Sequence, residues 1–372
     1  MTHRRTNQYT RRKVLRRLGL ATGALALPSA IRAIARRPQP EVSSAVASAE
    51  AAKPLEIVQA PAPAIATPSV SSSASPHRVV LVKTDDRVTG TRRAIELFQP
   101  QSFSGKTVFL KPNYNTGDPA PAATDANLLE ALIQEIQKGG ASQITVGDRS
   151  GMADTRQAMQ TKGAFDLADR YGLSAVVFDE LARDDWQTFP AEGTNWQRGF
   201  AIARPVLNAD AIVSTCCLKT HRFGGHFTLS LKNTIGMVAK YLPGDSYNYM
   251  RELHSSPNQR LMIAEVNKTY RPALVLVDGV EAFVGGGPEA GTVARPGVIL
   301  AGTDRIAVDA VGIAILRSLG TTHSISNGSI WDLEQIRRAA DLGLGATSAD
   351  QIEIITADSA STQMADEIRR FM

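Results

Sequence analysis

Cysteine is nearly absent from the sequence: Cys216 and Cys217 are the only two in 372 residues. Because they are adjacent, they cannot close a loop between distant segments, which excludes a stabilising disulfide framework. Two thiols are also too few for an iron–sulfur cluster held by four cysteines of the chain itself. We interpret both as small fillers near a strand end, with a strained disulfide between the two neighbours as the alternative.

Several catalytic motifs are also missing. No Gly-x-Ser-x-Gly sequence occurs, so a serine hydrolase has no support. The glycine-rich residues 285–291 lack the Gly-Lys-Ser/Thr ending of a P-loop and the spacing of a dinucleotide fingerprint. No repeat of about 20–50 residues is visible, which argues against a solenoid. We therefore interpret the glycine-rich run as a tight loop close to a functional site.

Acidic residues are missing from the first 35 positions, which hold eight lysines and arginines. Without that segment the formal net charge changes from +5 to −3. The remaining chain therefore has no excess of positive charge for a phosphate backbone, and we expect no nucleic-acid partner.

The amino terminus is typical of a targeting segment. Arg11 and Arg12 precede a weakly apolar stretch at residues 18–27, and Ala33 and Ala35 give a small-x-small cleavage pattern. This resembles a bacterial twin-arginine export signal, which predicts a periplasmic or otherwise exported protein. Pro28 interrupts an apolar stretch shorter than the roughly 20 residues of a membrane helix, so we expect no membrane span after signal removal. The expected organisation is a signal at residues 1–35, a disordered Ala/Pro/Ser linker at 36–77 and an α/β domain at 78–372.

Apolar strand-like runs alternate with helical patterns along the domain. The expected strands are residues 78–83, 107–110, 144–147, 175–178, 200–203, 211–213, 273–277, 297–300 and 352–355, and the expected helices are 89–98, 124–138, 155–171, 229–241, 258–269, 304–319 and 329–342. This alternation predicts an α/β fold, with a mostly parallel sheet covered by helices on both faces. We expect one main domain, in which residues 184–199 and 243–257 could form a small lid.

The stretch from residue 211 to 237 is the most informative for function. We expect the strand at 211–213 to end in a loop that carries Lys219, His221 and His226, followed by a helix with Lys232 and Asn233. Ligand sites in open α/β sheets lie beyond the carboxyl ends of the strands. Lys219, Lys232 and His221 are therefore the candidate catalytic residues, because lysines hold anions and histidine transfers protons near neutral pH. His221 and His226 are also candidate ligands of a divalent metal, with His254 or Asp278 as a third ligand.

Other strand ends carry further candidates for ligand binding: Lys111, Asn113, Asn233, Asp148, Asp278, Gly286 and Gly287. A lysine at a strand end suits a carboxylate or phosphate. The alternatives are that the lysines are solvated or only pin loops through carboxylates, and that Asp148 and Asp278 form turns through their own backbone.

Five ordered motifs form a combination: Lys111-Pro112-Asn113, Lys219-Thr220-His221, Leu231-Lys232-Asn233-x-x-Gly236, Asp278-Gly279 and Gly286-Gly287-Pro288-x-x-Gly291. Over residues 79–319 this combination resembles the bacterial and archaeal family called domain of unknown function 362. Some members of that family carry a ferredoxin-type cysteine module, which this sequence lacks. The resemblance implies no assigned reaction.

A second likeness is to nickel-pincer lactate racemases, in which a lysine holds the cofactor and histidines flank the metal. His221, His226 and Lys232 would be the matching set, but Leu229-Ser230-Leu231 stands where that family has glycines. Three hypotheses stay open: an enzyme acting on a small anionic molecule, a periplasmic protein that binds a metal or an anion, and a racemase-like enzyme with a metal or pincer cofactor.

Overall fold

The computed structural model describes residues 75–224 and 226–372. The expected export signal and most of the expected linker lie outside the described residues. Within them, no helix is both long enough and apolar enough to cross a membrane.

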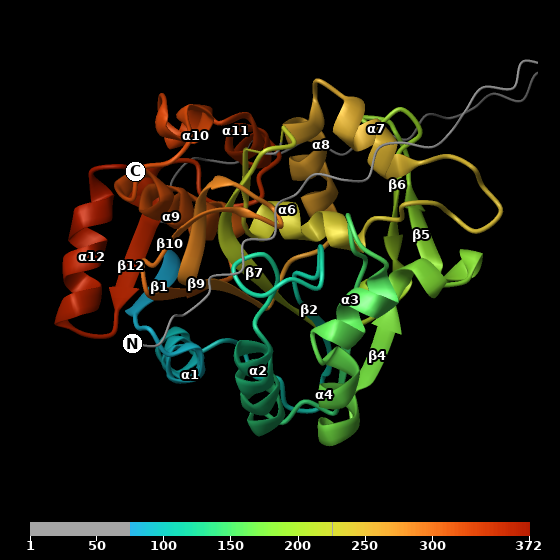
Figure 1. Cartoon of the computed structure of the whole chain (residues 1–372), viewed down its shortest axis with the longest axis horizontal. Coiled ribbons are helices and arrows are strands. Elements are labelled where there is room, and N and C mark those ends of the chain that lie inside the picture. Colours follow the sequence, from blue (N-terminus) through green and yellow to red (C-terminus); the bar gives the residue numbers. More distant parts are fainter. Residues whose placement is uncertain (1–74, 225) are drawn as a thin grey trace, which may run out of the picture. The chain divides into compact units, whose positions relative to one another are not determined.

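The strands form one ten-stranded sheet and a separate two-stranded one (Figure 1). Their bounds are β1 His77–Lys83, β2 Thr107–Lys111, β3 Gln143–Asp148, β4 Ser174–Val177, β5 Trp186–Phe189, β6 Phe200–Ala203, β7 Ala211–His221, β8 His226–Thr228, β9 Leu274–Gly286, β10 Gly291–Ala294, β11 Val298–Gly302 and β12 Ile352–Thr356.

The helices lie between these strands. Their bounds are α1 Arg87–Phe98, α2 Ala126–Lys138, α3 Thr155–Thr161, α4 Ala164–Tyr171, α5 Arg204–Leu207, α6 Ser230–Asn233, α7 Tyr249–Ser255, α8 Gln259–Val266, α9 Arg305–Ser318, α10 His323–Ser326, α11 Glu334–Asp341 and α12 Ser359–Arg369.

The main sheet runs in the order β12-β1-β11-β9-β7-β2-β3-β4, with β10 paired to β9 and β8 to β7. Along this path β11 is antiparallel to both neighbours, and the remaining pairs are parallel. The predicted mostly parallel sheet is therefore confirmed.

Helices cover both faces of the sheet (Figure 1). On one face α1 packs on β1 and β11 and α4 packs on β4, while Leu110 of β2 and Val146 of β3 join a cluster with Leu128 and Leu132 of α2. On the other face α9, in which 12 of 14 residues are buried, packs on β7, β9 and β11. Side chains therefore alternate between two apolar layers, as expected for strands buried on both sides.

Aspartates begin several of these helices. Asp125 accepts hydrogen bonds from two backbone N–H groups of α2, and Asp304 does the same at α9. Each aspartate satisfies N–H groups that have no partner inside the helix. The predicted start of the helix after Asp304 is confirmed.

The segment at residues 184–199, one of the two that could form a lid, contributes its two tryptophans to the core, while most of its other residues are partly or fully exposed. Strand β5 pairs with β6, while Trp186 is buried against Phe178 and Trp196 against Phe200. The indole N–H of Trp196 donates to the Met262 carbonyl at 3.2 Å. Residues 243–257, the other segment that could form a lid, contain helix α7.

Three sequence predictions near the site were wrong. The strand expected at 273–277 continues to Gly286, so Asp278 lies inside β9 rather than at its carboxyl end. The strand expected to end at residue 213 continues to His221, so Lys219 and His221 lie on β7 rather than in a loop. All eleven residues of β7 are buried, because β2, β9 and β8 pair with it along its length. The helix expected at 229–241 is a single turn, α6, followed by a 3₁₀ helix at Thr234–Met237.

Candidate functional site

The candidate site lies where the sheet changes its direction of winding. From β2 the chain proceeds to β3 and β4 on one side, whereas β7, on the other side of β2, is followed outward by β9 and β11. Lys111 at the end of β2 pairs with Ser214 of β7. In open α/β sheets, the carboxyl ends of strands at such a reversal border a crevice that binds ligands. A pocket lies at this point.

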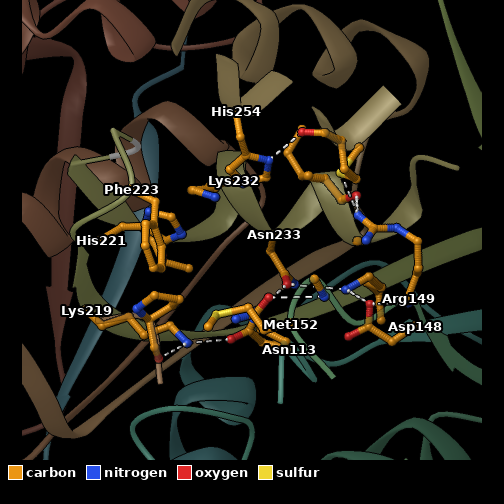
Figure 2. A pocket seen from close by; sticks show the side chains of 18 residues that line it. Asn113, Asp148, Arg149, Met152, Lys219, His221, Phe223, Lys232, Asn233 and His254 are labelled. Carbon is orange, nitrogen blue, oxygen red and sulfur yellow. Dashed lines mark hydrogen bonds and ion pairs between the residues drawn. The ribbon is translucent and has the colours of Figure 1, made fainter. Parts of the chain in front are cut away.

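We call it the central pocket, and its lining includes Lys111, Asp148, Lys219, His221, Lys232 and His254 (Figure 2). Its volume is about 80 Å³. One water needs about 10–15 Å³ on this scale, so there is room for roughly five to eight waters. A ligand held entirely inside is therefore a small molecule.

Lys111 and Asp148 form a buried ion pair at the bottom of the pocket. The Lys111 Nζ lies 2.7 Å from Asp148 Oδ1, and it also donates to the carbonyl of Pro112 and to Asn233 Oδ1. Burial lowers the pKa of Lys111 and raises that of Asp148, and each partner opposes the shift of the other. All three ammonium protons of Lys111 are therefore used inside the protein.

Gly236 lies directly over this ion pair. A Cβ at Gly236 would lie 2.4 Å from Asp148 Oδ1 and 2.7 Å from Lys111 Nζ. Only a residue without a side chain lets the backbone pass so close.

Lys219 is also fully engaged. Its Nζ donates to Asn113 Oδ1 at 3.0 Å, to the Pro288 carbonyl at 3.2 Å and to the Ala122 carbonyl. All three acceptors are uncharged, so its positive charge is not neutralised there. Burial lowers the pKa of Lys219.

Two glycines bring the Pro288 carbonyl to Lys219. Gly286 and Gly287 have φ values of 82° and 67°, and a Cβ at Gly287 would meet the Thr220 carbonyl oxygen at 2.1 Å. The glycine loop therefore lies against β7 at a distance that a side chain would prevent. This is the tight loop near the site that the sequence suggested.

Asn113 and Asn233 link the two lysines. Asn113 Nδ2 donates to Asn233 Oδ1 at 3.1 Å, and Asn233 Nδ2 donates to Ser214 Oγ at 2.9 Å. Because their hydrogen bonds are directed at protein atoms, both asparagines fix the walls of the pocket.

Arg149 adds a third buried cation. Its guanidinium donates to the carbonyls of Ile235 at 2.8 Å, Val238 at 2.7 Å and Ser150 at 3.0 Å. None of these acceptors carries a charge. Burial lowers the pKa of Arg149, but an arginine side chain stays protonated in proteins.

Lys232 differs from the other pocket lysines. Among the described residues, its Nζ has no hydrogen-bond acceptor and no ion-pair partner, although the side chain is only 9% exposed. Burial, followed by the charges of Lys219 and Arg149, lowers the pKa of Lys232 to about 7. A substantial share of Lys232 is therefore a neutral amine at neutral pH.

Two histidines lie on the same side of the pocket as Lys232 (Figure 2). The Nδ1 of His254 is 2.6 Å from the Met250 carbonyl, and since a carbonyl only accepts, Nδ1 carries the hydrogen. The Nδ1 of His221 is buried without a partner among the described residues. Burial lowers the pKa of both histidines, and nearby Lys232 contributes to each shift. Both rings are therefore neutral.

The position of helix α6 depends on a buried carboxylate of helix α9. Asp309 accepts from the backbone N–H groups of Ser230 at 2.8 Å and Leu231 at 3.1 Å, and from the Ser230 hydroxyl at 2.5 Å. Burial raises the pKa of Asp309 to about 7, against these hydrogen bonds. Asp309 therefore holds the turn that carries Lys232.

Two large apolar side chains of the pocket lining are exposed to solvent. Met152 is 49% exposed and Phe223 is 45% exposed, and both line the pocket. They are two of only five large hydrophobic side chains that are exposed in the described part of the chain. A ligand that extends out of the pocket would contact them.

Seven of the sequence candidates come together in the pocket lining: Lys111, Asn113, Asp148, Lys219, His221, Lys232 and Asn233. Four others do not line it. Asp278 pairs with Arg87, the first residue of α1, at 2.8 Å. Gly286 and Gly287 shape the loop that brings the Pro288 carbonyl to Lys219. His226 is the register partner of His221 on β8, but its charged neighbours are Arg260 and Glu334.

Sequence reasoning missed Arg149, Met152 and Phe223 as lining residues and treated His254 only as a third metal ligand. Arg149 carried a usable signal, because it follows Asp148 at a strand end. Met152 and Phe223 carried none, since isolated apolar residues in loops are common.

In the described residues, no group of three or more His, Cys, Asp or Glu side chains is arranged to hold a metal ion. His221 and His254 line the central pocket, and the one carboxylate in its lining, Asp148, pairs with Lys111. Cys216 and Cys217 are buried and free, and burial raises the pKa of both thiols.

The chain matches known proteins over much of its length. The family model described as Domain of unknown function (DUF362) matches residues 108–314. The thylakoid-associated protein sll1697 of Synechocystis sp. is 26% identical over 217 residues, which are 57% of this chain and 64% of that protein.

Among solved structures, the lactate racemase apoprotein from Thermoanaerobacterium thermosaccharolyticum matches with a TM-score of 0.38 and 15% identity. The match covers 79% of this chain and 86% of that one. A TM-score of this size supports no conclusion about function.

Proposed function

We propose that this chain, which belongs to the family described as Domain of unknown function (DUF362), binds a small anionic molecule in the central pocket and acts on it by proton transfer. In this proposal Lys219 and Arg149 supply the positive field, and Lys232 with His221 exchanges a proton with the ligand.

The observation that carries the proposal is the imbalance of charge in the pocket. Four cationic side chains line it, but Asp148 is the single carboxylate in the lining, and Lys111 already pairs with it. Lys219 and Arg149 are surrounded by neutral acceptors, and Lys232 has none among the described residues. Buried charges are normally paired, so a bound anion would complete this site.

The same arrangement supports chemistry beyond binding. A group with a pKa near the working pH is the most effective acid or base, and the pKa of Lys232 is about 7. An anion beside Lys232 would raise that pKa and so favour proton uptake during the reaction. His221, which also lines the pocket, supplies a neutral imidazole ring that can accept a proton.

Binding can be tested by thermal denaturation of the domain in acetate and in inorganic phosphate. A ligand at about 100 times its dissociation constant stabilises the folded state by about 2.7 kcal/mol, which is a rise in Tm of about 4 °C for a domain of about 300 residues. We expect this rise to be lost in Lys232→Met and kept in Lys268→Met, since Lys268 is exposed. Equal shifts in both variants would contradict binding at the pocket.

Turnover can be tested by incubating small carboxylates with the protein in deuterium oxide. Proton transfer at carbon would replace C–H by C–D, which proton NMR detects as signal loss. The alternative is a non-enzymatic anion-binding protein, which would bind the same carboxylates without any exchange. His221→Ala separates the two, because it should stop exchange while leaving the thermal shift largely intact.

Export is the second part of the proposal. It is supported by Arg11 and Arg12 before the weakly apolar stretch at 18–27. We expect the wild-type chain in the periplasm of a host with a twin-arginine pathway, and the Arg11→Lys/Arg12→Lys variant in the cytoplasm. Cell fractionation measures this, and equal distribution of both would contradict export by this route.

A further inference from the structure

This inference rests on the proposed function and narrows its ligand. From the contacts of the pocket lysines, we propose that Lys232 forms a covalent imine with a small carboxylate that also carries an aldehyde or ketone group.

The first argument is the difference between three buried lysines in one pocket. Lys111 and Lys219 each donate to three protein acceptors, so neither nitrogen has a free lone pair or a free proton. Lys232 donates to no described residue. Its nitrogen alone is available to a ligand inside the cavity.

The second argument is the setting of that nitrogen. A lysine amine becomes a nucleophile when it is desolvated and lies beside other cations, since both disfavour protonation. Lys232 meets both conditions, with Lys219 and Arg149 as the cations and the neutral rings of His221 and His254 as the other titratable groups that face it. The lowered pKa is the consequence of this geometry.

The third argument concerns the ligand's two ends. Uncompensated charge on Lys219 and Arg149 suits a carboxylate, and the free amine suits a carbonyl carbon. The cavity of about 80 Å³ limits the part between them to a few atoms. Small 2-oxo acids and aldehyde acids carry a carboxylate and a carbonyl group within a few atoms of each other.

The covalent step needs no oxidant or further reactant. The Lys232 lone pair attacks the carbonyl carbon and forms a C–N bond, while the C=O π electrons move to oxygen. A proton passes from nitrogen to that oxygen, and the carbinolamine loses water to give C=N. The Nε2 of His254 has a free lone pair, because its Nδ1 hydrogen is donated to Met250, so this ring can carry the proton.

Reductive trapping tests the proposal. The mature protein is incubated with glyoxylate or pyruvate and sodium cyanoborohydride at about pH 7, and intact mass and peptide mapping locate the adduct. At that pH an amine of pKa about 7 is unprotonated on the order of 10³ times more often than an ordinary lysine. We therefore expect a reduced adduct on Lys232 long before Lys268 is labelled.

Two variants and one competitor sharpen the result. Lys232→Arg keeps a cation and Lys232→Met keeps the size of the side chain, and neither should gain the early adduct. Acetate, which has no carbonyl carbon open to the amine, should slow labelling of Lys232 and leave Lys268 unchanged.

Labelling that is equally fast on Lys232 and Lys268, or that persists at the same rate in both variants, would overturn the imine. Failure of the proposed function has a different signature: acetate and phosphate would then give no thermal shift that depends on Lys232. If the thermal shift is present and the adduct absent, the anion site stands and the imine is wrong.

Discussion

Replacing Lys232 by methionine should stabilise the folded protein in acid and neutral solution. The pKa of Lys232 falls from 10.5 to about 7 on folding, which means that the folded state disfavours the charged amine. A shift of this size corresponds to about 5 kcal/mol, at about 1.4 kcal/mol per unit. Methionine fills a similar volume with an apolar thioether, so the variant escapes that cost.

The pH dependence has a definite sign. Between pH 7 and 10.5 the unfolded chain holds the Lys232 proton and the folded chain has released it, so the free energy of unfolding rises with pH through this group. Below pH 7 the cost of the charged amine is complete. The advantage of Lys232→Met should therefore be largest at about pH 6, up to about 5 kcal/mol, and nearly vanish at about pH 10.

Urea denaturation of both proteins across this pH range measures the difference. Lys111→Met is the matched control, since it removes an equally buried lysine but strands the Asp148 carboxylate, and it should destabilise the protein. The reasoning is refuted if Lys232→Met is less stable than wild type at about pH 6, or if the difference does not change with pH.

Three further predictions concern other residues in and beside the central pocket. Asp148→Asn should destabilise the domain by about 3–5 kcal/mol in urea denaturation, and the double variant with Lys111→Met should lose less than the sum of the two single changes. Asp309→Ala removes the acceptor of two backbone N–H groups before Lys232, so it should lower Tm by several degrees and also slow trapping of Lys232 by glyoxylate; unchanged trapping would mean that α6 keeps its place without Asp309. Phe223→Ala should weaken binding of carboxylates with an apolar tail by two- to fivefold and leave acetate unchanged, as titration calorimetry can measure.

The general fold could be predicted from sequence because it depends on local patterns. Apolar runs of strand length alternate with amphipathic segments, and Asp125 and Asp304 stand at the expected helix starts. The antiparallel direction of β11 had no such signal, since strand direction depends on which partners the strand finds. The carboxyl-terminal helix α12 was not predicted, and its mostly polar sequence explains why.

Prediction of the site succeeded for residue types and failed for local structure. Lysines and asparagines near proline and glycine marked the pocket, and five of them meet there with Asp148 and His221. The sequence did not distinguish Lys232 from Lys111 and Lys219, because the difference depends on acceptors such as the carbonyls of Ala122 and Pro288, which lie far away in the chain. The extent of β7 was missed for a similar reason: Ser214, Thr215 and Lys219 are polar, and they stay extended only because neighbouring strands pair with them.

The position of Lys219 and His221 on a strand ties the site to the register of the chain. Successive strand residues point to opposite faces, so Lys219 and His221 share one face, while Leu218 and Thr220 share the other. Deleting one residue of β7 before Leu218 would turn both site residues away and bring Leu218 toward the pocket. A change in the length of β7 therefore removes the site even when every site residue is retained, which makes the spacing from Ser214 to His221 as informative about relatives as the residues themselves.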